Sequence, residues 1–179
     1  SRAEVEDYRQ LREEVEAKVA RMSGNYASMD WSPVHFLTSS FSRDQLAALY
    51  RQARVGFVTP YRDGMNLVAK EYVACQKSQD PGVLVLSRFA GAAAELDAAL
   101  LVNPFDASDM GEKLAQALRM CLEERRERHR AMMAKLTTNT IAHWTDSFLD
   151  ALRHRDEPLK LQQIVSLPTR AARPLPPLQ

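Results

Sequence analysis

Residues 83–86 read Val-Leu-Val-Leu, and the turn sequence Asp-Pro-Gly precedes them at residues 80–82. Four aliphatic residues in a row, with no polar residue to face solvent, are typical of a β-strand that is buried on both faces. Strands of this kind occur almost only in parallel sheets that carry helices on their faces. The run therefore indicates an α/β fold built on a parallel sheet.

Shorter apolar runs and helical periodicity extend this prediction along the chain. Further strands are predicted at residues 34–37, 55–58 and 100–102. Apolar residues spaced three and four apart predict helices at residues 3–22, 66–76, 108–119, 122–137 and 139–153. The alternation of strands and helices predicts an incomplete Rossmann-like sheet with flanking helices, although four strands are few for a doubly wound domain.

Local signals refine two of these helices and predict the start of one more. Residues 42–45, Ser-Arg-Asp-Gln, resemble a helix cap, and Ser-Gly-Asn at residues 23–25 predicts the end of the first helix. The helix at residues 66–76 is apolar on almost all sides, so we expect it to be buried. From residue 156 the tail holds five of the nine prolines, which predicts an extended or disordered end after a domain of residues 1–155.

The near-equal numbers of basic and acidic residues argue against nucleic-acid binding. Lys and Arg total 24 and Asp and Glu total 23, so the chain lacks the basic excess of a nucleic-acid-binding domain. The densest basic run, residues 123–130, is interleaved with acids and predicts a solvated helix face that includes His129. No apolar run reaches the roughly 18–20 residues of a membrane span, and residues 1–7 do not resemble a signal peptide.

The cysteines and histidines do not predict a metal site. Cys75 and Cys121 are too few for a disulfide framework and are interpreted as buried thiols, which favours a cytoplasmic protein. The four histidines are scattered and form no metal-binding pattern, so no metal and no cofactor are expected. The glycine-rich fingerprints of dinucleotide-binding and P-loop proteins are also absent from the sequence.

Polar residues follow the ends of two predicted strands. Open α/β sheets bind their ligands beyond the carboxyl ends of the strands. After residues 55–58, the chain turns through Asp63 and Gly64 into a helix that begins near Asn66. The free amides at a helix start bind anions, and Glu71, near the second turn, could reach a diol such as a ribose. This combination suits a nucleotide diphosphate. A plain loop, a helix cap and a solvent-facing Glu71 explain the same spacing and remain an alternative.

The second strand end is less specific. Residues 87–92 follow the apolar run at residues 83–86, and small residues continue to residue 94. Small residues allow a backbone to approach a ligand closely, or a helix to approach a sheet. Both interpretations remain open for this segment.

Several stretches, in register, resemble the trehalose-6-phosphate synthase family. They are residues 58–74, 82–93 and 99–106, with shorter matches at residues 30–34 and 40–41, at residues 124–126 and at His129. The resemblance runs from Ser1 to about Leu152. It implies the C-terminal, nucleotide-sugar-binding domain of a retaining GT-B glycosyltransferase. That domain would lack its first strand region here, and the acceptor-side domain lies outside this sequence.

The resemblance implies an activity for the whole protein. Glucose would pass from UDP-glucose, or another NDP-glucose, to glucose-6-phosphate, giving α,α-trehalose 6-phosphate with retention. A relative with a different acceptor, such as glycerol 3-phosphate, and a non-catalytic regulatory module remain alternatives. Residues 1–179 alone are expected to be inactive. No membrane partner is expected, and a homo-oligomer is compatible with the resemblance.

The resemblance also implies residue roles. Asp63 would be catalytic and, with Gly64 and Met65, would hold the donor glucose. Glu71 would hold the ribose, Phe41 would read the base, and Arg2 would bind the acceptor phosphate. The donor nucleotide-sugar site as a whole would comprise Phe41, Asp63, Gly64, Met65, Asn66, Leu67, Val68, Ala69, Lys70 and Glu71, with the amides of Asn66, Leu67 and Val68 on the diphosphate. Tyr61 departs from the family pattern, where a leucine is expected.

Overall fold

The computed structural model describes residues 6–153, and its contacts divide the chain after Leu46 into two units. Each unit is described by itself. Arg2 and the proline-rich tail lie outside the described residues, so the predictions made for them stay predictions. Within residues 6–153, every helix is too short or too polar to serve as a membrane span.

The first unit holds α1 (Glu6–Tyr26). The predicted stop at residues 23–25 is wrong, because the helix continues to Tyr26 and the Ala27 amide still donates to the Ser23 carbonyl at 2.8 Å. Gly24 does not adopt the left-handed conformation that ends many helices. A single glycine inside an exposed helix costs only about 1 kcal/mol relative to alanine, which a long helix tolerates.

The strand predicted at residues 34–37 is also wrong. These residues form no strand, and no other described segment pairs with them. A strand is stable only when a neighbouring strand bonds to its backbone, and an apolar run of four residues does not show whether such a neighbour exists. The predicted cap of α2 (Arg43–Gln52) is confirmed. Ser42 Oγ accepts from the Gln45 amide at 3.3 Å, and Gln45 Oε1 accepts from the Ser42 amide at 2.9 Å.

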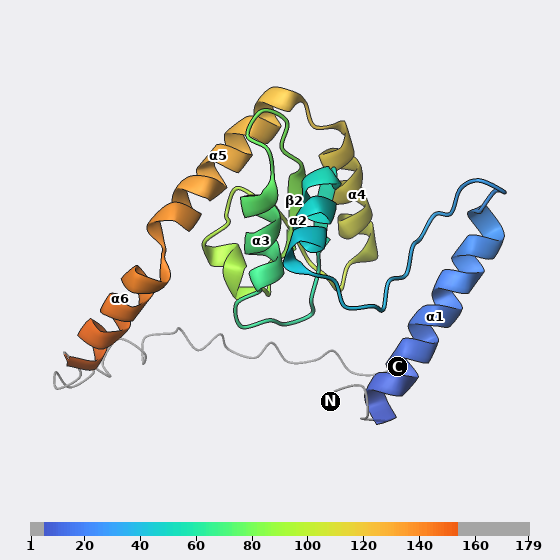
Figure 1. The fold of residues 1–179 in the computed structure, drawn as a ribbon, viewed down its shortest axis with the longest axis horizontal. Helices are drawn as coiled ribbons and strands as arrows, with labels where there is room; N and C mark the ends of the chain where they lie inside the picture. Colours follow the sequence, from blue (N-terminus) through green and yellow to red (C-terminus); the bar gives the residue numbers. More distant parts are fainter. Residues whose placement is uncertain (1–5, 154–179) are drawn as a thin grey trace, which may run out of the picture. The chain divides into compact units, whose positions relative to one another are not determined.

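The second unit is built on a three-stranded parallel sheet (Figure 1). The strands are β1 (Val55–Val58), β2 (Val83–Ser87) and β3 (Leu100–Val102), in that spatial order. Val55 pairs with Val83, and Leu86 pairs with Leu101. The prediction of a parallel sheet is confirmed, whereas the predicted count of four strands is wrong for the described residues because the run at residues 34–37 does not join the sheet.

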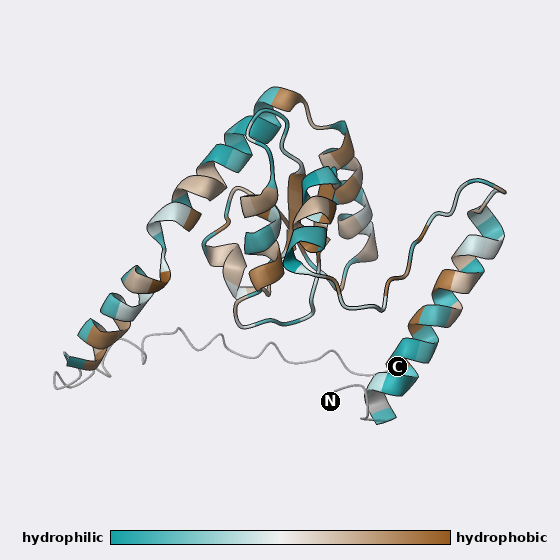
Figure 2. Cartoon of the chain, viewed as in Figure 1, coloured by the Kyte–Doolittle hydropathy of each residue, from teal (hydrophilic) through white to brown (hydrophobic). Residues whose placement is uncertain are grey.

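Helices cover both faces of β2, which explains why its residues are all buried. Leu84 and Leu86 pack with α3 (Leu67–Cys75), α5 (Leu122–Thr138) and the short helix η2 (Gly91–Ala94). Val83 and Val85 pack on the other side, against α4 (Ala107–Arg119). Figure 2 shows the resulting apolar centre between the helices. A last helix, α6 (Ile141–Arg153), follows α5 and is exposed throughout.

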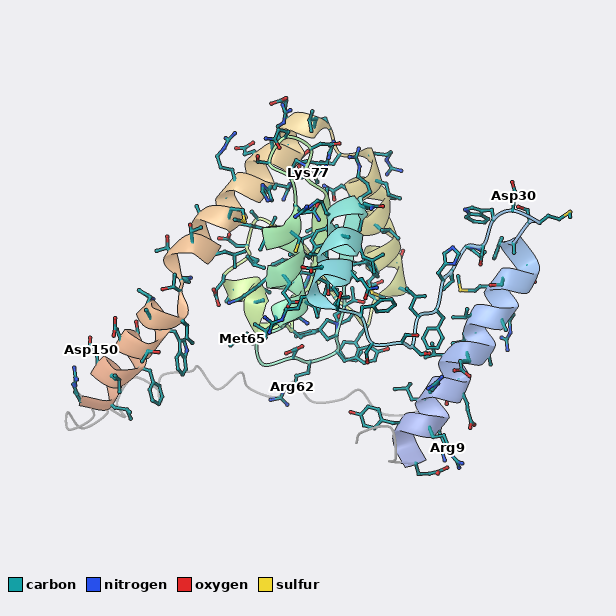
Figure 3. The ribbon with its side chains drawn as sticks, in the orientation of Figure 1. Arg9, Asp30, Arg62, Met65, Lys77 and Asp150 are labelled. Carbon is teal, nitrogen blue, oxygen red and sulfur yellow. The ribbon has the colours of Figure 1, made fainter. Side chains whose placement is uncertain are left out.

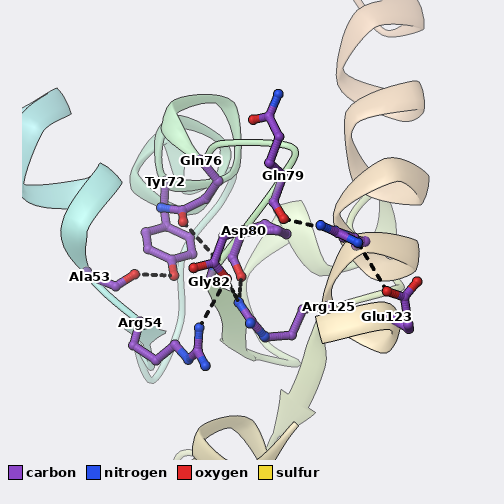
Figure 4. A network of polar contacts seen from close by, with 11 residues as sticks. Ala53, Arg54, Tyr72, Gln76, Gln79, Asp80, Gly82, Glu123 and Arg125 are labelled. Carbon is purple, nitrogen blue, oxygen red and sulfur yellow. Dashed lines mark hydrogen bonds and ion pairs between the residues drawn. The ribbon is translucent and has the colours of Figure 1, made fainter. Parts of the chain in front are cut away.

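A polar network closes the end of the sheet where the strands begin (Figure 4). Arg125 of α5 is only 4% exposed, and its guanidinium donates to Asp80 Oδ1 at 2.7 Å and to the Pro81 carbonyl. His129 is buried and its Nε2 lies 3.2 Å from the Val73 carbonyl. The prediction of a solvated helix face is therefore wrong for Arg125 and His129. One turn of helix separates them, so both lie on the face of α5 that meets α3 and the loop before β2.

The predicted buried thiols are only partly found. Cys75 is half-buried, whereas Cys121 is exposed because it caps the start of α5 rather than lying on its packed face. Neither cysteine forms a disulfide in the structure.

Candidate functional site

The two segments that follow β1 and β2 lie against each other. The loop after β1 and the segment after β2 bond backbone to backbone. Asp63 forms a parallel bridge with Ala90, its amide donates to the Phe89 carbonyl at 3.3 Å, and its carbonyl accepts from the Gly91 amide at 3.0 Å. The Ala92 amide donates to the Met65 carbonyl at 2.6 Å. The segments therefore form one site at the carboxyl edge of the sheet.

Asp63 and Asn66 fix the start of α3. Asp63 Oδ1 accepts from the Met65 amide at 3.1 Å, and Asp63 Oδ2 accepts from Asn66 Nδ2 at 3.0 Å. Asn66 adopts a left-handed conformation, with φ at 76°, and caps the helix by accepting from the Ala69 amide at 2.9 Å. Asparagine tolerates this conformation better than most residues. The carboxylate is thus held in place by two donors and can still accept further bonds.

The first turn of α3 has amides that the helix cap does not satisfy. The first amides of a helix have no intrahelical acceptor, and the Asn66 side chain satisfies that of Ala69. Within residues 6–153, the cap reaches neither the Leu67 nor the Val68 amide, so both are available to a ligand. The side chains of Leu67 and Val68 are exposed and that of Ala69 is buried, so the prediction that α3 is buried holds for one side only.

Gly64 lies beside open space. It does not have a positive φ, and a Cβ built on it would meet no atom within 4 Å. Neither the backbone conformation nor the packing within the described residues therefore requires a glycine here. Met65, the next residue, is half-exposed, and Figure 3 shows the Arg62 side chain projecting outward from the same loop.

The side chains of Lys70 and Glu71 differ in their contacts: Lys70 forms an ion pair, whereas Glu71 is exposed to solvent. Lys70 Nζ donates to Glu95 Oε1 at 2.8 Å, and this bond lowers the pKa of the Glu95 carboxyl below its ordinary value. Glu71, one residue later in α3, is exposed. The Lys70 ammonium thus ties α3 to the segment that follows η2, while the Glu71 carboxylate remains accessible.

Three aromatic residues that the sequence analysis did not single out as a group lie at the same edge of the sheet. Tyr61 follows β1, Phe89 follows β2 and Phe105 follows β3, and all three are exposed. Tyr61 stacks on Phe105 with ring centroids 4.8 Å apart, and Phe89 meets Phe105 edge to face at 5.9 Å. Each of them follows the end of its strand by two or three residues, and this recurring position was the signal in the sequence that could have found them.

The predictions for Phe41 and Arg2 stay predictions. Phe41 belongs to the first unit, where it is half-buried just before the cap of α2. Arg2 lies outside the described residues. Among residues 6–153, no three His, Cys, Asp or Glu side chains form a group that could hold a metal ion. The expectation of a metal-free site stays a prediction.

Known proteins resemble this chain over most of its length. The sequence profile of glycosyltransferase family 20 matches residues 1–154. Trehalose-6-phosphate synthase of Enterobacter sp. (strain 638) is 50% identical over 153 residues, which are 86% of this chain and 32% of that protein. The corresponding protein of Sodalis glossinidius is 48% identical over the same share of this chain and 33% of its own length.

Solved structures agree with the fold. A UDP-forming α,α-trehalose-phosphate synthase of Burkholderia xenovorans, in complex with glucose-6-phosphate, is 52% identical with a TM-score of 0.82, covering 86% of this chain and 34% of its own. The E. coli protein bound with UDP-2-fluoro glucose is 46% identical, with the same TM-score and coverage. The predicted α/β domain of a GT-B glycosyltransferase is thereby confirmed.

This chain spans about a third of the length of these relatives. The profile nevertheless covers both units, including the loop at Asp63, the start of α3 and the segment after β2. The chain belongs to glycosyltransferase family 20.

Proposed function

We propose that this chain supplies the UDP-glucose-binding part of a trehalose-6-phosphate synthase. The observation that carries the proposal is the loop at Asp63 and Asn66, which opens α3 at the carboxyl edge of a parallel sheet. That loop lies within the part of the chain that is about half identical to synthases, one of which was solved with UDP-2-fluoro glucose. Another nucleotide diphosphate glucose would fit the same contacts.

The start of α3 suits the diphosphate. The Leu67 and Val68 amides lie at the positive end of the helix, where two donors and the helix dipole stabilise an anion. The leaving group of the reaction is this same diphosphate, and it gains negative charge as the sugar departs. Amides that are fixed before the reaction stabilise that charge without a metal ion. We therefore propose a metal-free reaction.

Glu71 and Asp63 suit the two sugars of the donor. The exposed Glu71 carboxylate, one turn into α3, would accept bonds from the ribose hydroxyls. Asp63, with the open Gly64 backbone and Met65, would hold the hydroxyls of the glucose. The Asp63 carboxylate would also stabilise the positive charge that develops on the glucose ring as its bond to phosphate breaks.

The proposed transfer needs no reactant besides its two substrates. The bond between glucose C1 and the phosphate oxygen breaks with its electron pair, which leaves with UDP. A hydroxyl oxygen of glucose-6-phosphate bonds to C1, and its proton passes to the departing phosphate. Attack on the face that UDP leaves would retain the α configuration. We propose that Phe41 contacts the base and that Arg2 contacts the acceptor phosphate. Of the remaining donor residues, Ala69 would act through its backbone amide, which bonds to the Asn66 side chain, and Lys70 would act through its bond to Glu95.

The test uses the full-length protein, expressed from its whole coding sequence. Titration calorimetry should show binding of UDP, and a coupled assay should show UDP release from UDP-glucose that depends on glucose-6-phosphate. Glycerol 3-phosphate in place of glucose-6-phosphate tests the alternative acceptor. Protein that binds no UDP would contradict the proposal and favour a non-catalytic module. Treatment with EDTA should leave the rate unchanged, and a metal-dependent rate would contradict the metal-free step.

A further inference from the structure

Residues 63–65, called the donor loop below, contact a second segment to which no role in donor binding has been assigned above. Three backbone hydrogen bonds join residues 63–65 to residues 89–92, and their donor–acceptor distances are 2.6, 3.0 and 3.3 Å. Both segments leave the sheet at neighbouring strands, so the second one is anchored independently by β2. The segment after β2 is therefore placed to act as a template for the loop that carries Asp63.

Gly91 is the point of closest approach between the two segments. A Cβ built on Gly91 would lie 2.8 Å from the carbonyl carbon of Gly64 and 3.3 Å from the Met65 Cα, and it would overlap the Gly64 carbonyl oxygen. These are backbone atoms, which cannot turn aside as a side chain can. Gly91 has no positive φ, so its backbone conformation alone would accept another residue. The glycine is required by contact with the donor loop.

A side-chain contact continues the same connection one turn into α3. Glu95, just after η2, pairs with Lys70 at 2.8 Å, and the two side chains are 33% and 20% exposed. Glu95 Oε2 also accepts from Asn139 Nδ2 at 3.4 Å. The segment from Phe89 to Glu95 therefore meets both the loop before α3 and the helix that carries Glu71.

We propose that Gly91 is a positioning residue for donor binding, acting through the backbone of Gly64 and Met65, and that Glu95 supports it through Lys70. The proposal rests on the proposed function. An alanine at position 91 must push the loop away from β2, and the loop carries Asp63 and the start of the amide site. Misplacement of a binding group by about 1 Å costs on the order of 100-fold in enzymes.

The test compares two glycine variants of the full-length protein that differ in where the added methyl group clashes. In Gly91→Ala it meets the donor loop, and in Gly56→Ala it meets the Tyr72 ring at 2.7 Å, inside the core. Gly111→Ala is the neutral control, since no atom lies within 4 Å of its Cβ. The Gly91→Ala variant should raise the KM for UDP-glucose roughly 10- to 100-fold and leave the KM for glucose-6-phosphate within about two-fold.

The Gly56→Ala variant should lower the melting temperature without this split between donor and acceptor. An unchanged KM for UDP-glucose in Gly91→Ala, or an equal rise of both KM values, would overturn the proposal. If Gly91→Ala does not fold, Glu95→Gln decides, because it removes the charge that holds Lys70 at nearly constant volume. A several-fold rise in the KM for UDP-glucose supports the proposal, and an unchanged value overturns it.

Amide hydrogen exchange without nucleotide separates this proposal from the proposed function. Residues 63–69 should exchange faster in Gly91→Ala, or in Glu95→Gln, than in the wild type and in Gly56→Ala. Wild-type protein that fails to bind UDP would contradict the proposed function and leave this readout intact. Equal exchange rates in all variants would overturn the positioning role even if UDP binds.

Discussion

The side chains of Asp63 and Asn66 hold each other at the start of α3, with Asn66 Nδ2 donating to Asp63 Oδ2 at 3.0 Å while Asn66 Oδ1 accepts from the Ala69 amide at 2.9 Å. One side chain thus caps the helix and orients the carboxylate that we assign to the donor glucose. The left-handed backbone of Asn66, with φ at 76°, brings both bonds within reach.

Replacing Asn66 should destabilise the protein in a way that depends on the backbone. Asn66→Ala loses the cap, worth about 1 kcal/mol, and strains a left-handed residue by a further 1–2 kcal/mol, roughly. Asn66→Gly loses the same side chain without the strain, so it should cost about 1 kcal/mol or less. Urea unfolding of both variants measures the difference. Equal losses in the two variants would contradict a role for the left-handed conformation.

Asp63→Asn should separate catalysis from binding. The amide keeps the size of the carboxylate and can still accept from the Met65 amide, but its NH2 group cannot accept from Asn66 Nδ2. The three backbone bonds between residues 63–65 and residues 89–92 remain, so the loop should keep its shape. It loses the negative charge opposite the developing charge on the glucose. We expect kcat to fall by roughly 100-fold or more, as for loss of one transition-state group, while the affinity for UDP stays close to that of the wild type. A UDP affinity that falls as far as kcat would place Asp63 in binding rather than in catalysis.

Glu71→Ala should weaken UDP binding through the ribose alone. A hydrogen bond to a charged group contributes about 1.5–3 kcal/mol, which corresponds to a roughly 10- to 100-fold loss of affinity. The loss should vanish when the ligand is 2′,3′-dideoxy-UDP, which lacks the ribose hydroxyls. Glu112→Ala, at an exposed glutamate of α4, is the matched control and should bind both ligands as the wild type does. An equal loss for both ligands would contradict the contact with the ribose.

The parts of the fold that local pattern determines were predictable from the sequence. The run at residues 83–86 is buried on both faces whichever helices cover it, and the bond pattern at residues 42–45 depends on four adjacent residues. The loop at Asp63 was predictable for the same reason, because its turn and the helix that follows it are contiguous in the chain.

The parts that depend on distant segments were not predictable. Whether residues 34–37 form a strand depends on a neighbour that their own sequence does not specify. Arg125 and His129 are buried because the carbonyls of Pro81 and Val73 arrive from other elements to accept their bonds. Gly91 and Gly64 are 27 positions apart, so their contact could not be derived from either motif alone.

Tyr72 should make the fold sensitive to alkaline pH. Its hydroxyl donates to the Ala53 carbonyl at 3.0 Å, and burial raises the pKa of the phenol from 10.0 to about 12. The unfolded chain therefore ionises Tyr72 at lower pH than the folded protein does. Stability should fall as pH rises above 10, and Tyr72→Phe should flatten this fall. Melting temperatures between pH 8 and pH 11 measure it, and a parallel fall in both proteins would contradict the assignment.

Glu95 should make the stability of the folded protein fall at acid pH. The bond from Lys70 holds the pKa of the Glu95 carboxyl below its ordinary value of 4.5, with smaller help from Asn139. Because the folded protein favours the charged form, the contribution to stability is present above pH 4.5 and is lost as pH falls through the lowered pKa. Glu95→Gln should therefore melt below the wild type at pH 7, and the gap should close as pH falls below 4.5. Arg153→Gln, which removes an exposed pair with Asp150, is the surface control and should show little change at pH 7. The difference in melting temperature between Glu95→Gln and the wild type could instead persist below pH 4.5. That result would mean that lost packing destabilises the variant, and that the charge on Glu95 does not tie α3 to the segment after η2.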